Sequence, residues 1–438
     1  MFWLQLIAVV GAILLGSRLG SIGVGTAGGA GLVLLALLGI TVSMDQMPTD
    51  VITIIMTVIV AISAMQAAGG MDYLVHLAER VLRRNPRFLN VLAPTIVFLM
   101  TLASGTGHTC YSVMPVITEV AKEKNIRPSR PLSLAVIASQ IGITASPISA
   151  AVVALAAMIE MDVDYLTLLI VLIPTTLVAL VLTAIFMTFV DRVRGTADLD
   201  TLLIYKERLE QGLVKEPKGA QSIVVTPEAK RSLYLFLLGL TSVVFYATIT
   251  SSKVAWIENP TIGRNEAIIT VMLTVATAII LTCKIKASDI PGAGVFKTGM
   301  SAMICVLGVA WLGYAFIGHY TEDIERIAGD VLRDHPWTLA IVLFVGGMFL
   351  YSQAGTTRAL MPTALAIGAT PLSAVASFAA VAPPVMPTSP FLLAAIEIDD
   401  TGSTRIGRFL FNHPITVPGI INIVLVIVLR YAWGAFFI

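Results

Sequence analysis

S-G-T-G-H-T at residues 104–109 and S-Q-A-G-T-T at residues 352–357 are the central blocks of a pattern that occurs twice in this chain. The flanking blocks keep their order and nearly their spacing in both copies: V-L-R at 81 and 331, M-P at 114 and 361, P-L-S at 131 and 371, and T-A-S-P at 144 against P-T-S-P at 387. Chance could reproduce one such block but hardly five in order, so the sequence predicts an internal duplication.

The composition indicates a membrane protein. Of the 438 residues, 57% are apolar and only 13% are charged, whereas a soluble domain carries about 25% charge. Many apolar stretches are near twenty residues long, which predicts an all-α polytopic protein in a lipid bilayer. The net charge of +1 gives no sign of a nucleic-acid partner, and the three scattered cysteines support neither a disulfide framework nor a zinc site.

We expect about ten membrane spans, at 2–17, 21–42, 50–69, 131–158, 165–190, 232–250, 265–283, 296–318, 371–396 and 414–436. Two further apolar stretches, 88–121 and 337–370, are too long for one helix, and the two central blocks break each near its middle. Each half has only about 13–16 residues, short for a full crossing. We therefore expect two re-entrant hairpins with polar tips; the alternative is a pair of kinked full-length helices joined by a short loop.

The distribution of basic residues sets the expected orientation. With the N-terminus outside, the inner segments hold 22 Lys and Arg and the outer segments hold four, as the positive-inside rule requires. The segments at both ends of the first hairpin, 71–87 and 122–130, are basic, and this supports a hairpin that returns to the same side. Both termini are then expected in the periplasm.

This topology makes the two repeats inverted, because span 50–69 runs inward and its counterpart 296–318 runs outward. The expected domains are a first repeat at 1–190, a cytoplasmic linker at 191–231 with a short helix near 199–213, and a second repeat at 232–438. The broken spans of the two repeats are 131–158 and 371–396. The charged amphipathic segments 72–84 and 321–333 are expected as helices along the two membrane surfaces.

Broken helices at matching places in two repeats point to the binding site of a secondary transporter, because irregular backbone at membrane depth must line a cavity or be buried in protein. Arg358 follows the second tip directly and has no Asp or Glu in register nearby. Burying such a charge costs at least roughly 2.5–3.5 kcal/mol. We infer that an anionic substrate is its partner; backbone carbonyls at a helix end are the alternative. Arg430, beside Tyr431 and Trp433, is expected to reach the membrane interface.

Hydroxyls, glycines and half-helix N-termini at the tips suit a small carboxylate. The candidate substrate-binding residues there are Ser104, Gly105, Thr106, Gly107, His108 and Thr109 of the first tip, and Ser352, Gln353, Gly355, Thr356 and Thr357 of the second. His108 is either a donor or proton carrier for the substrate or a helix-packing histidine.

The breaks at 139–147 and 382–390 add four candidate hydroxyls, those of Thr144, Ser146, Thr388 and Ser389. Proline frees upstream carbonyls there, and such carbonyls with hydroxyls either hold Na⁺ or form a plain hinge. Sodium thus stays open as a coupling ion, and no other cofactor or metal is expected. No acidic residue lies in the middle of a span, which argues against a carboxylate proton relay.

Several stretches resemble the anaerobic C4-dicarboxylate transporter (Dcu) family of bacteria: G-T-G-H-T at 105, R-P-L-S at 130, I-T-A-S-P-I-S-A-A-V-V at 143, G-S-R-L-G-S-I-G-V-G at 16 and I-G-R-F-L-F-N-H-P at 406. The resemblance covers nearly the whole chain. It implies an inner-membrane carrier that exchanges fumarate, malate or aspartate for succinate. It also implies a broader ion-transporter group with paired hairpins and an elevator mechanism.

On this basis we expect an exchanger of small dicarboxylate anions, with a Na⁺- or H⁺-coupled symporter as the alternative. Spans 21–69 and 232–318 form the expected scaffold and hold the interface of a homodimer, while 88–190 and 337–436 form the transport unit. A membrane sensor or channel is a different class, and two occluding hairpins disfavour a channel. An enzyme is not expected, because no nucleophile–base set appears at the tips.

Overall fold

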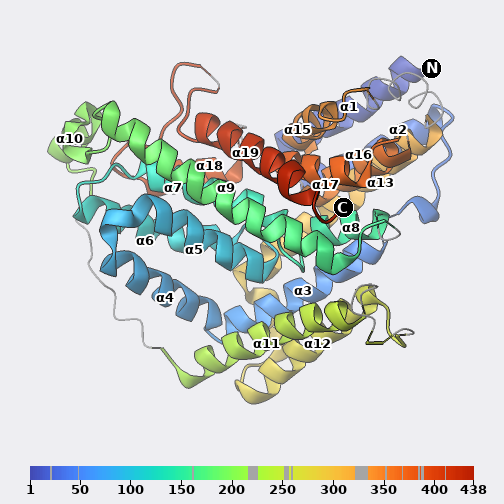
Figure 1. Cartoon of the computed structure of the whole chain (residues 1–438), viewed down its shortest axis with the longest axis horizontal. Helices are drawn as coiled ribbons and strands as arrows, with labels where there is room; N and C mark the ends of the chain where they lie inside the picture. The colour runs from blue at the N-terminus through green and yellow to red at the C-terminus, as the bar shows by residue number, and fades with distance from the viewer. Residues whose placement is uncertain are drawn as a thin grey trace.

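The computed structural model describes the chain except residues 20–21, 48, 160–161, 216–224, 251–255, 258–259, 321–333, 351–352, 367, 383–384, 386–388 and 410. Within the described residues the chain is helical, with a single isolated β-bridge between Ile126 and Asp198. The expected all-α class is therefore confirmed (Figure 1). The expected surface helix at 321–333 lies outside the described residues.

The first repeat contains nine α-helices in its described part: α1 (Phe2–Leu19), α2 (Gly23–Leu37), α3 (Thr49–Ala67), α4 (Gly70–Arg84), α5 (Leu89–Ser104), α6 (Thr109–Glu123), α7 (Ser129–Ile143), α8 (Ala150–Met158) and α9 (Tyr165–Val193). Helices α5 and α6 form the expected helical hairpin around the first tip. The expected break in span 131–158 falls between α7 and α8.

The linker region holds the short helices η3 (Leu199–Thr201) and α10 (Leu203–Glu210), which match the helix expected near 199–213. The second repeat follows as α11 (Pro227–Ile249), α12 (Arg264–Thr282), η4 (Ala287–Gly292), α13 (Gly294–His319), α15 (Thr338–Leu350), α16 (Gln353–Ala366), α17 (Pro371–Ser377), η5 (Phe378–Val381), α18 (Pro390–Ile398) and α19 (Thr416–Gly434). Helices α15 and α16 form the second hairpin, and span 371–396 is broken between α17 and α18 as expected.

By length and composition, five helices of the described chain are long and apolar enough to cross a membrane, or up to six if the bent pair α3–α4 counts as one span. These five are 86–104, 165–193, 227–249, 265–282 and 416–434. The total of about ten spans stays a prediction. The first arm of hairpin α5–α6 is among the five. Its length therefore fits both the re-entrant hairpin and the alternative of two full-length helices.

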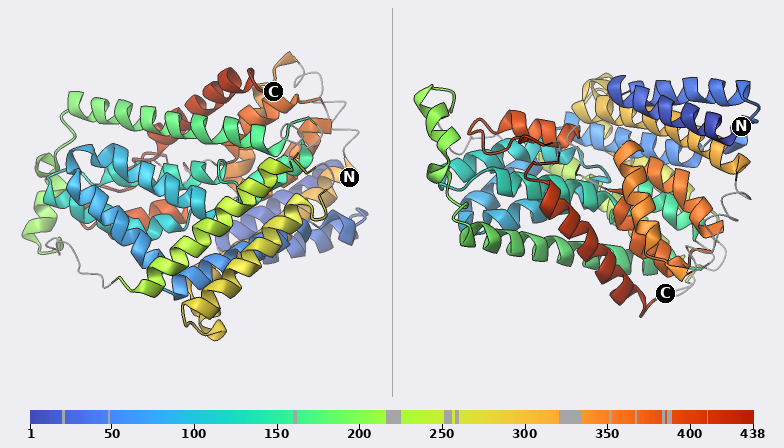
Figure 2. Two further views of the ribbon diagram at one scale, coloured as in Figure 1. Left: turned by 60° about the horizontal axis from the view of Figure 1, so that its bottom comes forward. Right: turned by 90° about the horizontal axis from the view of Figure 1, so that it is seen from above.

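The helices pack in two groups. One group contains α1, α2, α3, α11, α12 and α13, and the other contains α5 to α9 with α15 to α19. Figures 1 and 2 show α11 and α12 beside α3 at one edge of the molecule, away from α19. The two groups meet along α13 and α16, and α4 packs against both α11 and α6. The division into a scaffold and a transport unit stays a prediction.

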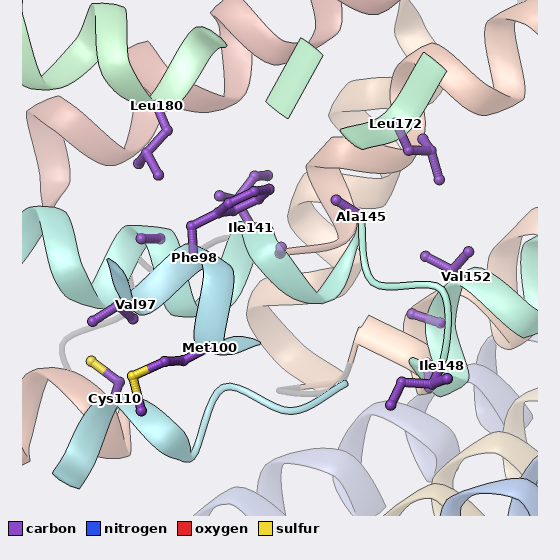
Figure 3. Packing of buried hydrophobic residues seen from close by; sticks show 14 of the residues in the cluster. Val97, Phe98, Met100, Cys110, Ile141, Ala145, Ile148, Val152, Leu172 and Leu180 are labelled. Carbon is purple, nitrogen blue, oxygen red and sulfur yellow. The ribbon is translucent and has the colours of Figure 1, made fainter. Parts of the chain in front are cut away.

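The core of the second group lies between α5 and α7. Phe98 of α5 and Ile141 of α7 are at most 1% exposed and lie together at the centre of this contact (Figure 3). A β-carbon on Gly142 would lie 3.0 Å from Thr101 Cγ2, so the two helices approach closely. Almost all of α7 is buried. A helix that is hydrophobic on all sides packs in a protein interior. The break between α7 and α8 therefore also lies inside the protein.

The basic segments assigned to the inner face gather at one end of the second group. Arg83 of α4 pairs with Glu79, Glu119 and Glu123. Lys122 joins two further expected inner segments, because its Nζ lies 3.0 Å from Asp400 Oδ2. These contacts place the hairpin base, the linker and the α18–α19 loop on the same side. Which membrane face this is stays a prediction.

Candidate functional site

The first tip is a tight turn that begins at a left-handed glycine. Helix α5 ends at Ser104, and Gly105 has φ +68°, a conformation that residues with a β-carbon rarely adopt. A β-carbon at Gly105 would also lie 3.2 Å from the Ile148 carbonyl oxygen, in the turn that precedes α8. The tip of the first hairpin therefore packs directly on the α7–α8 break.

Hydroxyl groups of the first tip fix its own backbone. Ser104 Oγ donates to the Thr106 carbonyl at 3.0 Å, and Thr106 Oγ1 accepts from the His108 amide at 3.4 Å. The hydroxyls of Thr109 and Thr101 lie 3.5 Å apart, and Thr109 is 2% exposed. The predicted hydroxyls thus fix the conformation of the tip through hydrogen bonds within it.

Gln140 of α7 joins the two tips. A β-carbon on Gly107 would lie 2.9 Å from Gln140 Nε2 and 3.0 Å from the Ser139 carbonyl oxygen, so only glycine allows the first tip to come this close. On the other side, Gln353 Nε2 donates to Gln140 Oε1 at 2.9 Å. Gln353 is the first residue of α16. One buried amide therefore lies against both hairpins.

Three rings cover one side of this contact. His108 stacks on Phe391 and Tyr111 with centroid distances of 5.6 and 5.8 Å, and Tyr111 and Phe391 lie 4.7 Å apart. Nδ1 of His108 is buried, and no described residue hydrogen-bonds to it. His108 therefore packs against neighbouring rings, as expected of a helix-packing histidine. Its Nδ1 is also available to a substrate or a proton, as expected of a donor or proton carrier.

The second tip leads into α16. Thr356 and Thr357 are fully buried, and Thr357 Oγ1 donates to the Gln353 carbonyl at 2.7 Å. Gly355 is also buried. Ser352 lies outside the described residues.

Arg358 lies on α16 where this helix faces the other group. Its side chain is half-buried and lies near Tyr314 of α13. Arg358 and Gln353 are five residues apart, so they point about 140° from each other around the helix. The guanidinium thus lies at the seam between the two groups, while Gln353 faces α7.

The hydroxyls predicted at the helix breaks are held inside the protein. Ser146 Oγ donates to the Leu102 carbonyl at 2.7 Å, and Thr144 Oγ1 donates to the Ile141 carbonyl at 2.8 Å. Ser389 is 7% exposed and precedes α18. Thr388 lies outside the described residues. These contacts tie the first break to α5 and to the end of α7.

The expectation that Arg430 reaches the membrane interface is wrong. Its side chain is 0% exposed and hydrogen-bonds to Thr144 and Thr176. Sequence position near the end of the last span suggested an exit, but α19 packs along α9 and α17 and turns this side chain inward.

Sequence reasoning missed Gln140, Tyr111, Phe391 and Tyr314. Gln140 had a signal, because it is an amide inside an otherwise apolar helix and belongs to the stretch that includes the first break. The three aromatic residues had none, since aromatic side chains are common throughout apolar spans and only the packing of distant helices brings them to the tips.

Two hairpins that meet inside a membrane-type helical bundle, at breaks in two further helices, are the arrangement in which secondary transporters place their binding site. The whole chain, residues 1–438, matches the family described as anaerobic C4-dicarboxylate membrane transporters. The chain belongs to this family, whose members are transporters and not enzymes.

Curated relatives agree over almost their full length. The chain is 51% identical to the C4-dicarboxylate transporter DcuA of Wolinella succinogenes, over 96% of each chain, and 48% identical to DcuA of Escherichia coli (strain K12), over 100% of each. It is 34% identical to the anaerobic C4-dicarboxylate transporter DcuB of Escherichia coli, over 100% of this chain and 99% of that one.

Among solved structures, the Alcanivorax borkumensis YdaH transporter has a similar fold, with a TM-score of 0.58 and 12% identity over 87% of this chain and 85% of that one. At this identity the likeness concerns the fold alone. The family match and the curated relatives confirm the sequence-based resemblance to the dicarboxylate family and the multi-pass membrane class.

Proposed function

We propose that this protein exchanges C4-dicarboxylates across the bacterial inner membrane, taking in fumarate, malate or aspartate and releasing succinate. The observation that supports a shared site most directly is the Gln140 side chain, which contacts Gly107 of the first tip and Gln353 of the second. The substrate class is taken from the relatives, which are named C4-dicarboxylate transporters.

In the proposed complex a small dianion extends from the first tip, past the start of α16, to Arg358 at the seam between the two groups. Arg358 takes one carboxylate, because a guanidinium forms charge-assisted hydrogen bonds to a carboxylate that are about twice as strong as neutral ones. The other carboxylate meets the first tip, where His108 and the Gln140 amide supply donors. The N-terminal turn of α16 adds backbone N–H groups and a favourable dipole.

The remaining predicted residues complete the shell or shape it. Their hydroxyls and small side chains keep the two tips in register with the substrate: Ser104, Gly105, Thr106, Thr109, Thr144, Ser146, Ser352, Gly355, Thr356, Thr357, Thr388 and Ser389. For the buried members of this set, the contacts described above favour a positioning role.

We further propose an elevator motion in which the transport unit slides past the scaffold. The seam between α13 and α16 supports this, because the proposed site lies on it. The proposal keeps both termini periplasmic and places a homodimer interface on the scaffold. Many scaffold side chains on α11 and α12 are exposed and apolar, such as Leu238, Phe245 and Leu281, as a lipid or subunit contact requires.

The proposed exchange mode follows from the electric charge of the transport unit. An empty transport unit carries two arginines inside the protein, Arg358 and Arg430, and must move their positive charge through the membrane field, at about 2.3 kcal/mol per charge per 100 mV. A bound dianion offsets both charges and lowers this cost. The loaded unit therefore crosses readily in both directions, and the empty unit crosses slowly.

Counterflow in proteoliposomes tests the function. Vesicles loaded with unlabelled succinate should take up labelled succinate, and external fumarate, malate and aspartate should compete for that uptake while monocarboxylates should not. An imposed Na⁺ or pH gradient should not drive uptake into succinate-free vesicles. Concentrative uptake under either gradient would favour the coupled symporter instead, and currents faster than a carrier can produce would indicate a channel.

A further inference from the structure

Arg430 is an interior cation that the proposed substrate site does not use. Its side chain is fully buried, and Nη2 donates to Thr144 Oγ1 and to Thr176 Oγ1, each at 3.0 Å. Nη2 also donates to the Thr144 carbonyl at 3.2 Å. Nη1 lies 3.5 Å from the Val375 carbonyl, and Cζ lies 5.8 Å from the centroid of the Phe378 ring. Among the described residues no carboxylate pairs with it.

The oxygens around this guanidinium come from the two broken spans. Thr144 is the residue that ends α7, at the first break. Val375 lies in α17, which η5 follows before the second break. The helices α7 and α17 are counterparts in the duplicated sequence, so Arg430 joins the broken spans of both repeats. Thr176, from the central part of α9, supplies the remaining hydroxyl.

Such a place suits a cation for a simple electrostatic reason. The C-terminal end of a helix carries partial negative charge on carbonyl groups that lack an intrahelical partner. In membrane transporters, the C-terminal ends of interrupted helices and their unwound carbonyls coordinate Na⁺. Here two carbonyls and two hydroxyls already surround a positive side-chain group.

We propose that Arg430 is a tethered cation that fills a position between the two broken spans, at the end of α7, where a transporter with interrupted helices would otherwise hold a coupling Na⁺. The side chain neutralises the helix ends permanently, so the protein needs no soluble cation to assemble its substrate site. The consequence for transport rests on the proposed exchange function, whereas the occupancy of the position by Arg430 does not.

The first test uses the wild-type protein. Its Tm in detergent, measured in choline chloride and in NaCl at equal ionic strength, should be the same, and so should its rate of succinate counterflow. A saturable rise of the wild-type Tm or rate with Na⁺ would overturn the proposal. Absence of any dicarboxylate counterflow with an unchanged Tm would count against the proposed function and leave the resident cation standing.

The second test removes the guanidinium. Arg430→Ala should have a lower Tm than wild type in choline chloride, and millimolar Na⁺ or guanidinium chloride should raise it saturably, as ligand binding to the folded state requires. Counterflow by this variant should become Na⁺-dependent. An Arg430→Ala protein whose Tm and counterflow ignore both cations would contradict the proposal.

Two further variants keep the test decisive if Arg430→Ala fails to fold. Arg430→Lys retains a tethered positive charge and should restore Na⁺-independent stability. Arg430→Met fills much of the volume without charge and should be destabilised, with little gain from either cation. A stable Met variant that transports at the wild-type rate would show that no cation is needed at this position.

Discussion

Gln353 donates its side-chain amide to Oε1 of Gln140 at 2.9 Å, and this hydrogen bond joins the tip of the second hairpin to a buried helix of the first repeat. Gln140 is 9% exposed and its own amide lies against Gly107 and Ser139. Residues 213 positions apart in the chain thus meet in one polar contact inside an apolar bundle.

The two glutamines should act as a unit. Gln140→Leu and Gln353→Leu should each weaken succinate binding, because each leaves the partner amide without its hydrogen bond, at a cost of about 1–3 kcal/mol. The double variant should lose little more than the more damaging single variant. Binding to purified protein measures this directly.

Gln5→Leu is the matched control, since Gln5 is a buried amide of α1 that bonds to the Leu38 carbonyl outside the site. It should lower stability and leave succinate affinity unchanged. Fully additive losses in the Gln140 and Gln353 pair would show that the two amides act independently.

Gly107→Ala should impair transport through the first tip. The new β-carbon would lie 2.9 Å from Gln140 Nε2 and 3.4 Å from the Phe391 ring. Either the tip or the Gln140 amide must then move. We expect counterflow to fall about tenfold or more, which corresponds to at least about 1.4 kcal/mol. Gly29→Ala of α2 offers a control, because its β-carbon would meet nothing within 4 Å; equal losses in the two variants would argue against a role of the tip.

The ion pair at the base of the first hairpin should contribute to stability. Lys122 is 8% exposed at its side chain and bonds to both Asp400 oxygens and to the Lys215 carbonyl. Lys122→Met should lower the free energy of unfolding by about 1–3 kcal/mol, because hydrogen bonds to a charged group are lost.

Thermal scanning of the detergent-solubilised protein measures the effect. Lys124→Met, two residues along and exposed, is the control and should keep the wild-type Tm. If both variants have the same Tm as wild type, the hairpin base is held by packing alone.

Much of the architecture could be predicted from the sequence, because it depends on local patterns. The polar clusters at 104–109 and 352–357 interrupt apolar stretches, and the structure forms helical hairpins around both. The breaks at 144–149 and after 381 follow from proline and from residues that prefer turns. The order of these features along each repeat can be read directly from the sequence.

The composition of the site was less predictable, because it depends on the rotation of each helix. Arg358 and Gln353 are neighbours in sequence, yet the helix turns one toward α13 and the other toward α7. Arg430 lies near a helix end, yet the packing of α19 turns it inward. Phe391 and Tyr111 come together only through the contact of α18 with α6. Such tertiary rotations are set by packing between distant segments, which no local pattern encodes.

The most direct test of the account concerns the arginine at the seam. Fumarate–succinate exchange should be measured in proteoliposomes with wild type, Arg358→Ala, Arg358→Lys and, as a control, Arg405→Ala, which changes an exposed residue of the α18–α19 loop. The account predicts that Arg358→Ala loses roughly tenfold to a hundredfold of the exchange rate, in line with one lost charge-assisted contact. It predicts partial activity for the lysine variant and an unchanged rate for Arg405→Ala. Exchange by Arg358→Ala at the wild-type rate would contradict it.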